Sequence, residues 1–272
     1  MRRASARLWL PLCLAPSLLS AESQTWTFAV VADPQIGMVE AKRDRENFAC
    51  VAEAINARKP RLVLIAGDLI DTAGSKPQLD LYEQVKRTFV PSTYAVPGNH
   101  DVAREGKRLE SALLDGYRAR LGPDRFAAED GGSLFLGLNS QLWTAAGGLP
   151  DEQLAWLEAR LKDRSRYRHV FVVQHHPLFL SAPDEPDEYF NTPLAWRSRL
   201  LRAFEDGRVT AVLTGHLHRQ LSASYHGIAM ITTPSSCRNF DGSGYGYRLF
   251  TVNEDGFTEQ YVTVPGTIPE PK

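Results

Sequence analysis

Acidic, amide and imidazole side chains follow several short apolar runs of this 272-residue chain, at the point where each run ends. Carboxylate and amide oxygens and imidazole nitrogens can all donate lone pairs to a divalent cation, and as a set they suit manganese, iron or zinc rather than calcium. Seven residues are therefore candidate metal ligands: Asp33, Gln35, Asp68, Asn99, His175, His216 and His218.

Seven ligands exceed the three or four that a single ion needs, so the sequence predicts two ions that share one carboxylate. Two ions about 3.5–4 Å apart can hold both the attacking and the departing oxygen of an in-line phosphoryl displacement. They also lower the pKa of bound water and so supply hydroxide near neutral pH. These residues therefore favour hydrolysis of a phosphate ester by attack of a metal-bound hydroxide.

Short apolar runs must position these ligands. Strands are expected at residues 26–32, 62–66, 93–96, 133–138, 170–173 and 209–213, and helices at 46–58, 79–89, 107–121, 151–164 and 193–205. Alternating strands and helices predict βαβ units and an α/β fold in which helices cover a sheet. Strand ends then collect at one edge, where ligands bind in such folds. Further strands at 222–226, 228–232, 247–253 and 257–264 suggest a second sheet.

The first 21 residues have the layout of a cleavable signal peptide. Arg2, Arg3 and Arg7 precede an apolar run, and the small residues Ser20 and Ala21 follow it. A membrane anchor is the alternative, but the run is shorter than the roughly 20 residues that span a bilayer. We therefore expect a signal peptide at residues 1–21, a single domain at 22–272 without a membrane span, and a secreted or periplasmic protein.

The charge and the cysteines restrict the partners and the covalent links of the chain. Its 31 Lys and Arg residues nearly balance 32 Asp and Glu residues, so no basic field indicates a nucleic-acid partner. Beyond the signal segment, Cys50 and Cys237 could form one disulfide. Cys50 lies on the apolar face of an expected helix, which favours a buried free thiol. The sequence gives no indication of oligomeric state.

The chain resembles the calcineurin-like metallophosphoesterase superfamily over essentially its whole expected mature length. The resemblance is carried by five ordered motifs, Asp33-Pro34-Gln35, Gly67-Asp68, Gly98-Asn99-His100-Asp101, His175 and Gly215-His216-Leu217-His218. It implies a four-layer α/β/β/α sandwich of two mixed sheets flanked by helices, with the metals above the sheets. Leu138-Asn139-Ser140-Gln141 and Tyr189-Phe190-Asn191 resemble one branch, the calcineurin-like phosphoesterase domain-containing serine/threonine phosphatases of animals.

The resemblance also implies a role for each site residue. Asp33 and His218 would bind the first metal, Asp68 would bridge, and Asn99, His175 and His216 would bind the second. His100 would contact the scissile phosphate and protonate the leaving oxygen, and Asp101 would orient His100. Substrate contacts are expected from Asn139 and Arg219, although a turn role for Asn139 and a solvated surface role for Arg219 are alternatives.

Gln35 departs from the commonest pattern of the superfamily, in which histidine occupies this position. A neutral amide oxygen is a harder and weaker donor than imidazole, so the first site would favour manganese, iron or magnesium over zinc. Alternatively, a water molecule fills the coordination position and Gln35 does not bind the metal directly.

The leading functional hypothesis is hydrolysis of phosphate monoesters, either phosphoproteins or small phosphate esters. The same metals would serve a phosphodiesterase acting on a cyclic nucleotide, a nucleic acid or a phospholipid headgroup. A non-catalytic binding module that has kept the fold is a third class. His100, Asp101 and nearly all the ligands are present, which disfavours that last hypothesis.

Overall fold

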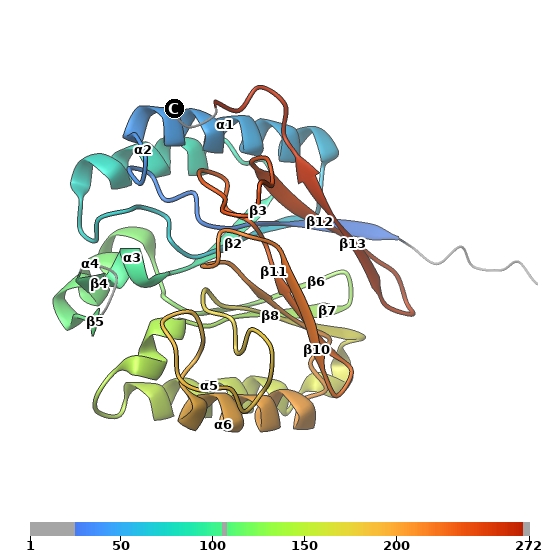
Figure 1. The fold of residues 1–272 in the computed structure, drawn as a ribbon. Helices are drawn as coiled ribbons and strands as arrows, with labels where there is room; N and C mark the ends of the chain where they lie inside the picture. The colour runs from blue at the N-terminus through green and yellow to red at the C-terminus, as the bar shows by residue number, and fades with distance from the viewer. Residues whose placement is uncertain (1–24, 105–107, 269–272) are drawn as a thin grey trace, which may run out of the picture.

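The computed structural model describes residues 25–104 and 108–268, which form two facing β-sheets with helices on their outer surfaces (Figure 1). The expected signal peptide, residues 1–21, lies outside the described residues. Among the described residues, no helix combines the length and the apolar character needed to cross a membrane.

The first sheet has the order β13-β12-β1-β2-β3, and the second has the order β10-β11-β9-β8-β7-β6. The strands of the first sheet are β1 (Trp26–Val31), β2 (Leu62–Ala66), β3 (Ser92–Val96), β12 (Gly246–Val252) and β13 (Phe257–Thr263). Those of the second are β6 (Phe126–Asp130), β7 (Ser133–Gly137), β8 (His169–Val173), β9 (Ala211–Thr214), β10 (Leu221–Tyr225) and β11 (Ile228–Thr232). Both sheets are mixed: β1, β2 and β3 run parallel, as do β7, β8, β9 and β11, whereas the remaining strands pair antiparallel.

Helices cover the outer face of each sheet, and a small helical lobe lies at one end (Figure 1). The helices are α1 (Ala41–Arg58), α2 (Lys76–Lys86), α3 (Asn99–Val102), α4 (Ser111–Leu121), α5 (Leu149–Leu161) and α6 (Leu194–Asp206), with 3-10 helices η1 (Ser140–Thr144) and η2 (Arg164–Arg166). Helices α1 and α2 cover the first sheet, and α5 and α6 cover the second. The expected α/β/β/α sandwich is confirmed.

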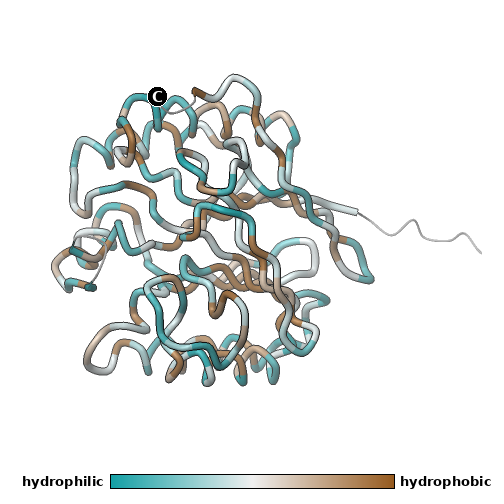
Figure 2. The backbone as a smooth tube through the Cα atoms, in the orientation of Figure 1, coloured by the Kyte–Doolittle hydropathy of each residue, from teal (hydrophilic) through white to brown (hydrophobic). Residues whose placement is uncertain are grey.

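Side-chain alternation along the strands builds this layering, because successive residues of a strand point to opposite faces. On β1, Ala29 and Val31 join the core under α1 and α2, whereas Phe28 and Val30 lie between the sheets. Phe28 meets Phe135 of the second sheet with ring centroids 5.2 Å apart. Figure 2 shows hydrophobic segments concentrated in the central strands. Strands buried on both faces explain why the sequence shows continuous apolar runs.

Two local expectations differ from the structure. The helix expected from residue 107 begins at Ser111, because β5 (Arg108–Leu109) pairs instead with β4 (Ala103–Arg104). Strand β6 was not expected, since its sequence has two alanines, two acidic residues and no β-branched side chain. Antiparallel pairing with β7 holds it in the sheet. Both cysteines of the described residues, Cys50 and Cys237, are free; Cys237 is buried, whereas Cys50 is only half-buried.

Candidate metal centre

The two sheets bring the expected ligands together at the carboxyl ends of their strands. Asp68 and Asn99 follow β2 and β3 of the first sheet, and His175 and His216 follow β8 and β9 of the second. The Nε2 atom of His175 lies 3.1 Å from Asp68 Oδ2, 3.0 Å from Asn99 Oδ1 and 3.2 Å from His216 Nδ1. Four donors from four strand ends therefore converge on one small volume.

Asp33 and His218 extend this group on its other side. Asp33 Oδ1 lies 3.5 Å from His218 Nε2 and 3.8 Å from His175 Nδ1. Both Asp33 oxygens also accept hydrogen bonds from the backbone amide of His216, at 3.1 and 3.0 Å. Asp33 follows β1 of the first sheet, whereas His218 follows β9 of the second. The cluster is thus elongated, with Asp33 and His218 at one end and Asn99 and His216 at the other.

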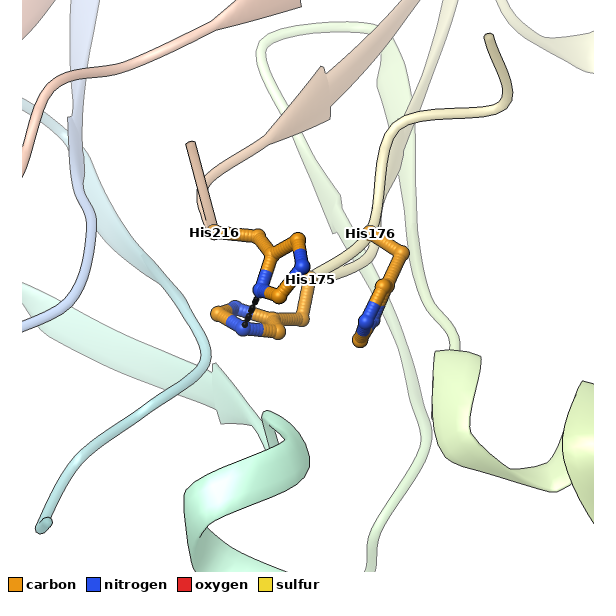
Figure 3. Close-up of side chains that lie close together, drawn as sticks. All are labelled: His175, His176 and His216. Carbon is orange, nitrogen blue, oxygen red and sulfur yellow. Dashed lines mark hydrogen bonds between the residues drawn. The ribbon is translucent and has the colours of Figure 1, made fainter. Parts of the chain in front are cut away.

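Each of the three imidazoles is fixed by a backbone carbonyl. His175 Nδ1 donates to Ala66 O at 2.8 Å, His216 Nε2 to Tyr189 O at 3.1 Å, and His218 Nδ1 to Arg238 O at 2.6 Å. A ring nitrogen that donates carries a proton, so the opposite nitrogen of a neutral ring presents its lone pair. Those opposite nitrogens are the ones that face the cluster, and Figure 3 shows His175 and His216 directed toward each other. This arrangement fixes the tautomers that metal ligation requires.

The backbone at the ligand positions is unusual. Eight non-glycine residues of the described chain have positive φ, between 34° and 69°, and five of them are expected ligands: Asp33, Gln35, Asp68, His216 and His218. Side chains disfavour this region, which costs of order 1–3 kcal/mol per residue and collects at functional sites. The strand ends turn sharply enough to aim these side chains into one site.

Three glycines of the motifs leave room for the ligands. A Cβ atom on Gly98 would lie 2.2 Å from Asp68 Oδ1, and one on Gly215 would lie 2.5 Å from Asp33 Oδ2. On Gly67, which has φ of +83°, it would lie 2.5 Å from His175 Nδ1. Glycine is thus required at these positions chiefly because ligands pack directly against its Cα atom.

The electrostatics of the site reflect buried ionisable groups that lie close together. Burial opposes charge on His175, but the carboxylates of Asp68 and Asp33 outweigh it and raise the pKa of His175 to about 9. Burial also opposes charge on Asp68, yet His175 lowers the Asp68 pKa below its ordinary value. Burial, together with the nearby His175 charge, lowers the pKa of His216 to about 3. The carboxylates therefore favour a proton on His175, whereas His216 stays neutral, and His175 must release that proton before it can bind a cation.

Gln35 provides a test of whether the site fits a metal ion. Its side chain is buried, and Nε2 donates to Asp71 Oδ1 at 3.2 Å. The other end of the amide, Oε1, is buried without a hydrogen-bond partner among the described residues. An unsatisfied buried acceptor costs about 1–3 kcal/mol, a cost that coordination to a cation would remove. The orphaned oxygen and the oriented imidazoles both fit divalent ions.

The structure corrects the expected partner of His100. The ring Nδ1 of His100 donates to the backbone oxygen of Asp71 at 2.7 Å, and Asp71 Oδ1 lies 3.7 Å away. The Asp101 carboxylate instead accepts hydrogen bonds from the backbone amides of Leu69 and Gly98. The expectation that Asp101 orients the His100 ring is therefore wrong. Asp101 is the third residue of α3, so its carboxylate turns back to cap that helix.

The two weaker substrate-binding candidates lie in different environments. Asn139 is fully buried; its amide donates to Asp124 and its oxygen accepts from the Gln141 amide at the start of η1. These bonds favour the turn role of Asn139 over a substrate contact. Arg219 follows His218 and is exposed, so it remains a candidate substrate contact.

Two neighbours of the ligands, His176 and Asp71, were not among the site residues predicted from the sequence. His176 Nδ1 lies 3.1 Å from Ser140 Oγ of η1, and the centroid of its ring lies 3.9 Å from that of His216 (Figure 3). Sequence reasoning missed Asp71, whose contacts fix both Gln35 and His100. Its position three residues after the Gly67-Asp68 motif was the available signal.

Comparisons with known proteins identify relatives over most of the chain. The family described as calcineurin-like phosphoesterase matches residues 27–220. A serine/threonine-protein phosphatase of Danio rerio, CPPED1, is 31% identical over 90% of this chain and 88% of its own length. The 3′,5′-cyclic adenosine monophosphate phosphodiesterase CpdA of Escherichia coli K12 is 28% identical over 78% of each protein.

Solved structures show the same fold. A dimetal phosphatase from Danio rerio superposes with a TM-score of 0.65 and 16% identity, covering 87% of this chain and 95% of that one. The purple acid phosphatase PPD1 from yellow lupin gives a TM-score of 0.68 at 14% identity, covering 91% of this chain and 53% of that one. At these identities the likeness concerns the fold.

Proposed function

Because the chain belongs to the calcineurin-like phosphoesterase family, whose members hydrolyse phosphate esters at a dimetal centre, we propose that its own substrates are phosphate monoesters. The supporting observation is the set of three imidazoles, each tied to a backbone carbonyl. The opposite nitrogen of His175 faces Asp68 and Asn99, that of His216 faces His175, and that of His218 faces Asp33. Histidines that bind metals in proteins are commonly oriented by such a bond from the other ring nitrogen.

We assign the ligands to two positions along the elongated cluster. Asp33, Gln35 and His218 would hold the first ion, and Asn99, His175 and His216 the second, with Asp68 between them. When bound, two such ions neutralise charge on the phosphoryl oxygens and make hydroxide available near neutral pH. The oxygen and nitrogen donors suit manganese, iron or zinc, and the amide of Gln35 favours manganese or iron at the first position.

We assign to His100 the delivery of the proton that the departing alcohol needs. Its Nδ1 is held by the Asp71 carbonyl, so a protonated ring keeps Nε2–H free to donate. The ring lines a groove of about 520 Å³ together with Asp71, Thr72, Ala73, Ala103, Arg104 and Leu113. As the bond between phosphorus and the alcohol oxygen breaks, transfer of this proton would neutralise the alkoxide.

Two observations favour monoesters over diesters. The relative named as a serine/threonine-protein phosphatase matches more of the chain, at higher identity, than the cyclic nucleotide phosphodiesterase does. The nearly balanced net charge of the chain also disfavours a polyanionic nucleic acid as substrate.

The test is to assay manganese-loaded protein on para-nitrophenyl phosphate and on bis-para-nitrophenyl phosphate. We expect a higher kcat/KM on the monoester. A higher kcat/KM on the diester would favour a phosphodiesterase. No hydrolysis of either compound would favour the hypothesis of a non-catalytic binding module.

We also propose that the protein is exported after removal of residues 1–21. The support comes from the arginines, the apolar run and the small residues at the start of the chain. Terminal sequencing of the protein from its native cells should find a chain that begins near Glu22. Soluble protein in the cytoplasm that retains Met1 would refute this proposal.

A further inference from the structure

Exposed aromatic side chains gather around the metal-binding imidazoles. Six large apolar residues of the described chain are exposed, and the three aromatic ones are Tyr189, Phe190 and Phe240, at 49%, 48% and 63% exposure. Each of the three packs against a ligand histidine. Exposed apolar surface is unfavourable at about 25 cal/mol per Å², so a cluster at one functional site calls for an explanation.

The aromatic rings lie at both ends of the ligand cluster. Tyr189 and Phe190 have ring centroids 4.9 and 5.9 Å from that of His216. Phe240 is stacked on His218, with centroids 5.4 Å apart and planes at 27°. His216 and His218 belong to different metal positions in the proposed assignment, so aromatic surface flanks both sides of the place where phosphate would bind.

Residues 181–192, which carry Tyr189 and Phe190, are held in place by a network of polar contacts. The Glu185 carboxylate accepts hydrogen bonds from the amides of Leu180, Ser181 and Ala182 and from Asn191 Nδ2. Burial opposes this charge, but the bonds from Asn191 and the amides lower the Glu185 pKa to about 2.

The buried Arg197 guanidinium holds the same segment from α6. It donates to the carbonyl oxygens of Thr192, Pro183 and Glu185. An aromatic pair on so constrained a segment is pre-organised for binding, and little conformational entropy is lost when a ligand contacts it.

We propose that Tyr189, Phe190 and Phe240 select phosphate esters that carry a planar aromatic group within a few bonds of the phosphate. Offset stacking and edge-to-face contacts favour a flat ring over an aliphatic group of similar size. This inference rests on the proposed phosphomonoesterase function and names its substrate class. The aromatic group could belong to an aryl-bearing alcohol or to a nucleoside, and both share the chemistry that the three rings recognise.

The test compares benzyl phosphate with cyclohexylmethyl phosphate. Both release a primary alcohol, so their intrinsic reactivities are similar and the aromatic ring is the main difference. We expect the wild-type protein to favour benzyl phosphate in kcat/KM by about 3- to 10-fold, the range of an aromatic pair. Adenosine 5′-monophosphate compared with ribose 5-phosphate forms the second arm and separates a nucleoside source from an aryl source.

Variants then assign the preference to the rings. Phe190→Ala and Phe240→Ala should each reduce the preference, mainly by raising KM for benzyl phosphate, because ring contacts exist in both the ground and transition states. Tyr189→Phe keeps the ring but loses the hydroxyl that bonds Asn99 Nδ2 at 3.0 Å, so it should keep the preference. Val90→Ala, which truncates an exposed apolar residue on another part of the surface, is the matched control and should change neither value.

The outcomes of this experiment separate the two proposals. Hydrolysis of para-nitrophenyl phosphate with equal kcat/KM on both members of both substrate pairs would overturn the aromatic inference and leave the phosphomonoesterase function standing. A preference that survives in Phe190→Ala and in Phe240→Ala would also overturn it. Failure to hydrolyse any phosphate monoester would overturn the proposed function itself.

Discussion

Replacing Gly98 by alanine tests how tightly the ligands are packed against the backbone. The new Cβ atom would lie 2.2 Å from Asp68 Oδ1 and 2.4 Å from the Asp68 backbone nitrogen. Ordinary contacts begin near 3.4 Å, so the two segments must separate by about 1 Å. Because one of the two contacts is to backbone, rotation of the Asp68 side chain alone cannot relieve the overlap.

The expected losses of stability and activity in Gly98→Ala follow from that displacement. Overpacking of this kind costs about 1–3 kcal/mol, which lowers Tm by roughly 2–12 °C in a chain of this length. Asp68 Oδ1 also accepts the His100 amide at 2.8 Å, so one movement disturbs both the proposed bridging ligand and the proposed acid. A misplacement near 1 Å typically costs about 10²-fold in rate, and we expect that loss in kcat/KM on para-nitrophenyl phosphate.

Gly116→Ala is the matched control. Gly116 lies in α4, and a Cβ atom there would meet nothing within 4 Å. Alanine is favoured over glycine in a helix by about 1 kcal/mol, so Tm should rise by a few degrees while activity stays unchanged. Thermal unfolding and steady-state kinetics on both variants measure the contrast. Activity of Gly98→Ala within twofold of wild type would refute the packing argument.

Three further substitutions probe individual side chains. His100→Asn should lower turnover of alkyl phosphates by about 10²–10⁴-fold and of para-nitrophenyl phosphate by less, with metal content kept; equal losses would argue against an acid. Gln35→His should shift metal preference toward zinc in competition binding, and an unchanged preference would place Gln35 outside the ligand set. Glu185→Gln should speed hydrogen exchange of the Ser181 and Ala182 amides about 10-fold at pH 7. The Glu185 pKa is lowered from its ordinary 4.5 to about 2, so the difference in exchange rate between variant and wild type should be complete above pH 4.5 and fade toward pH 2. Equal exchange rates of the two proteins at pH 7 would contradict the role of the carboxylate.

The fold was accessible from sequence because its strands are short apolar runs that end in polar motifs. Runs such as Leu62–Ala66 are buried on both faces, so they contrast sharply with the amphipathic helices between them. Strand β6 lacks that contrast, since pairing with β7 rather than its own composition makes it a strand. Local pattern reveals elements that have their own preference and misses those imposed by a neighbour.

The site was predictable in its residues and less so in its contacts. Spacing places Asp68 and His175 at strand ends, but it cannot show that Ala66 holds the His175 ring or that Asp71 holds His100. Sharp turns with positive φ, and an isolated β-bridge between Ile36 and Ile70, bring such groups together, and neither feature is visible in the spacing of the motifs. The family resemblance suggested Asp101 as the partner of His100, whereas the Asp101 carboxylate instead caps α3.

The metal content of the active protein tests the central claim most directly. Elemental analysis of metal-replete protein, combined with activity on para-nitrophenyl phosphate, should find close to two transition-metal ions per chain, with activity falling as the ions are removed by a chelator. The converging donors of Asp33, Asp68, Asn99, His175 and His216 lead to this expectation. Full activity in protein that contains no metal would contradict the account.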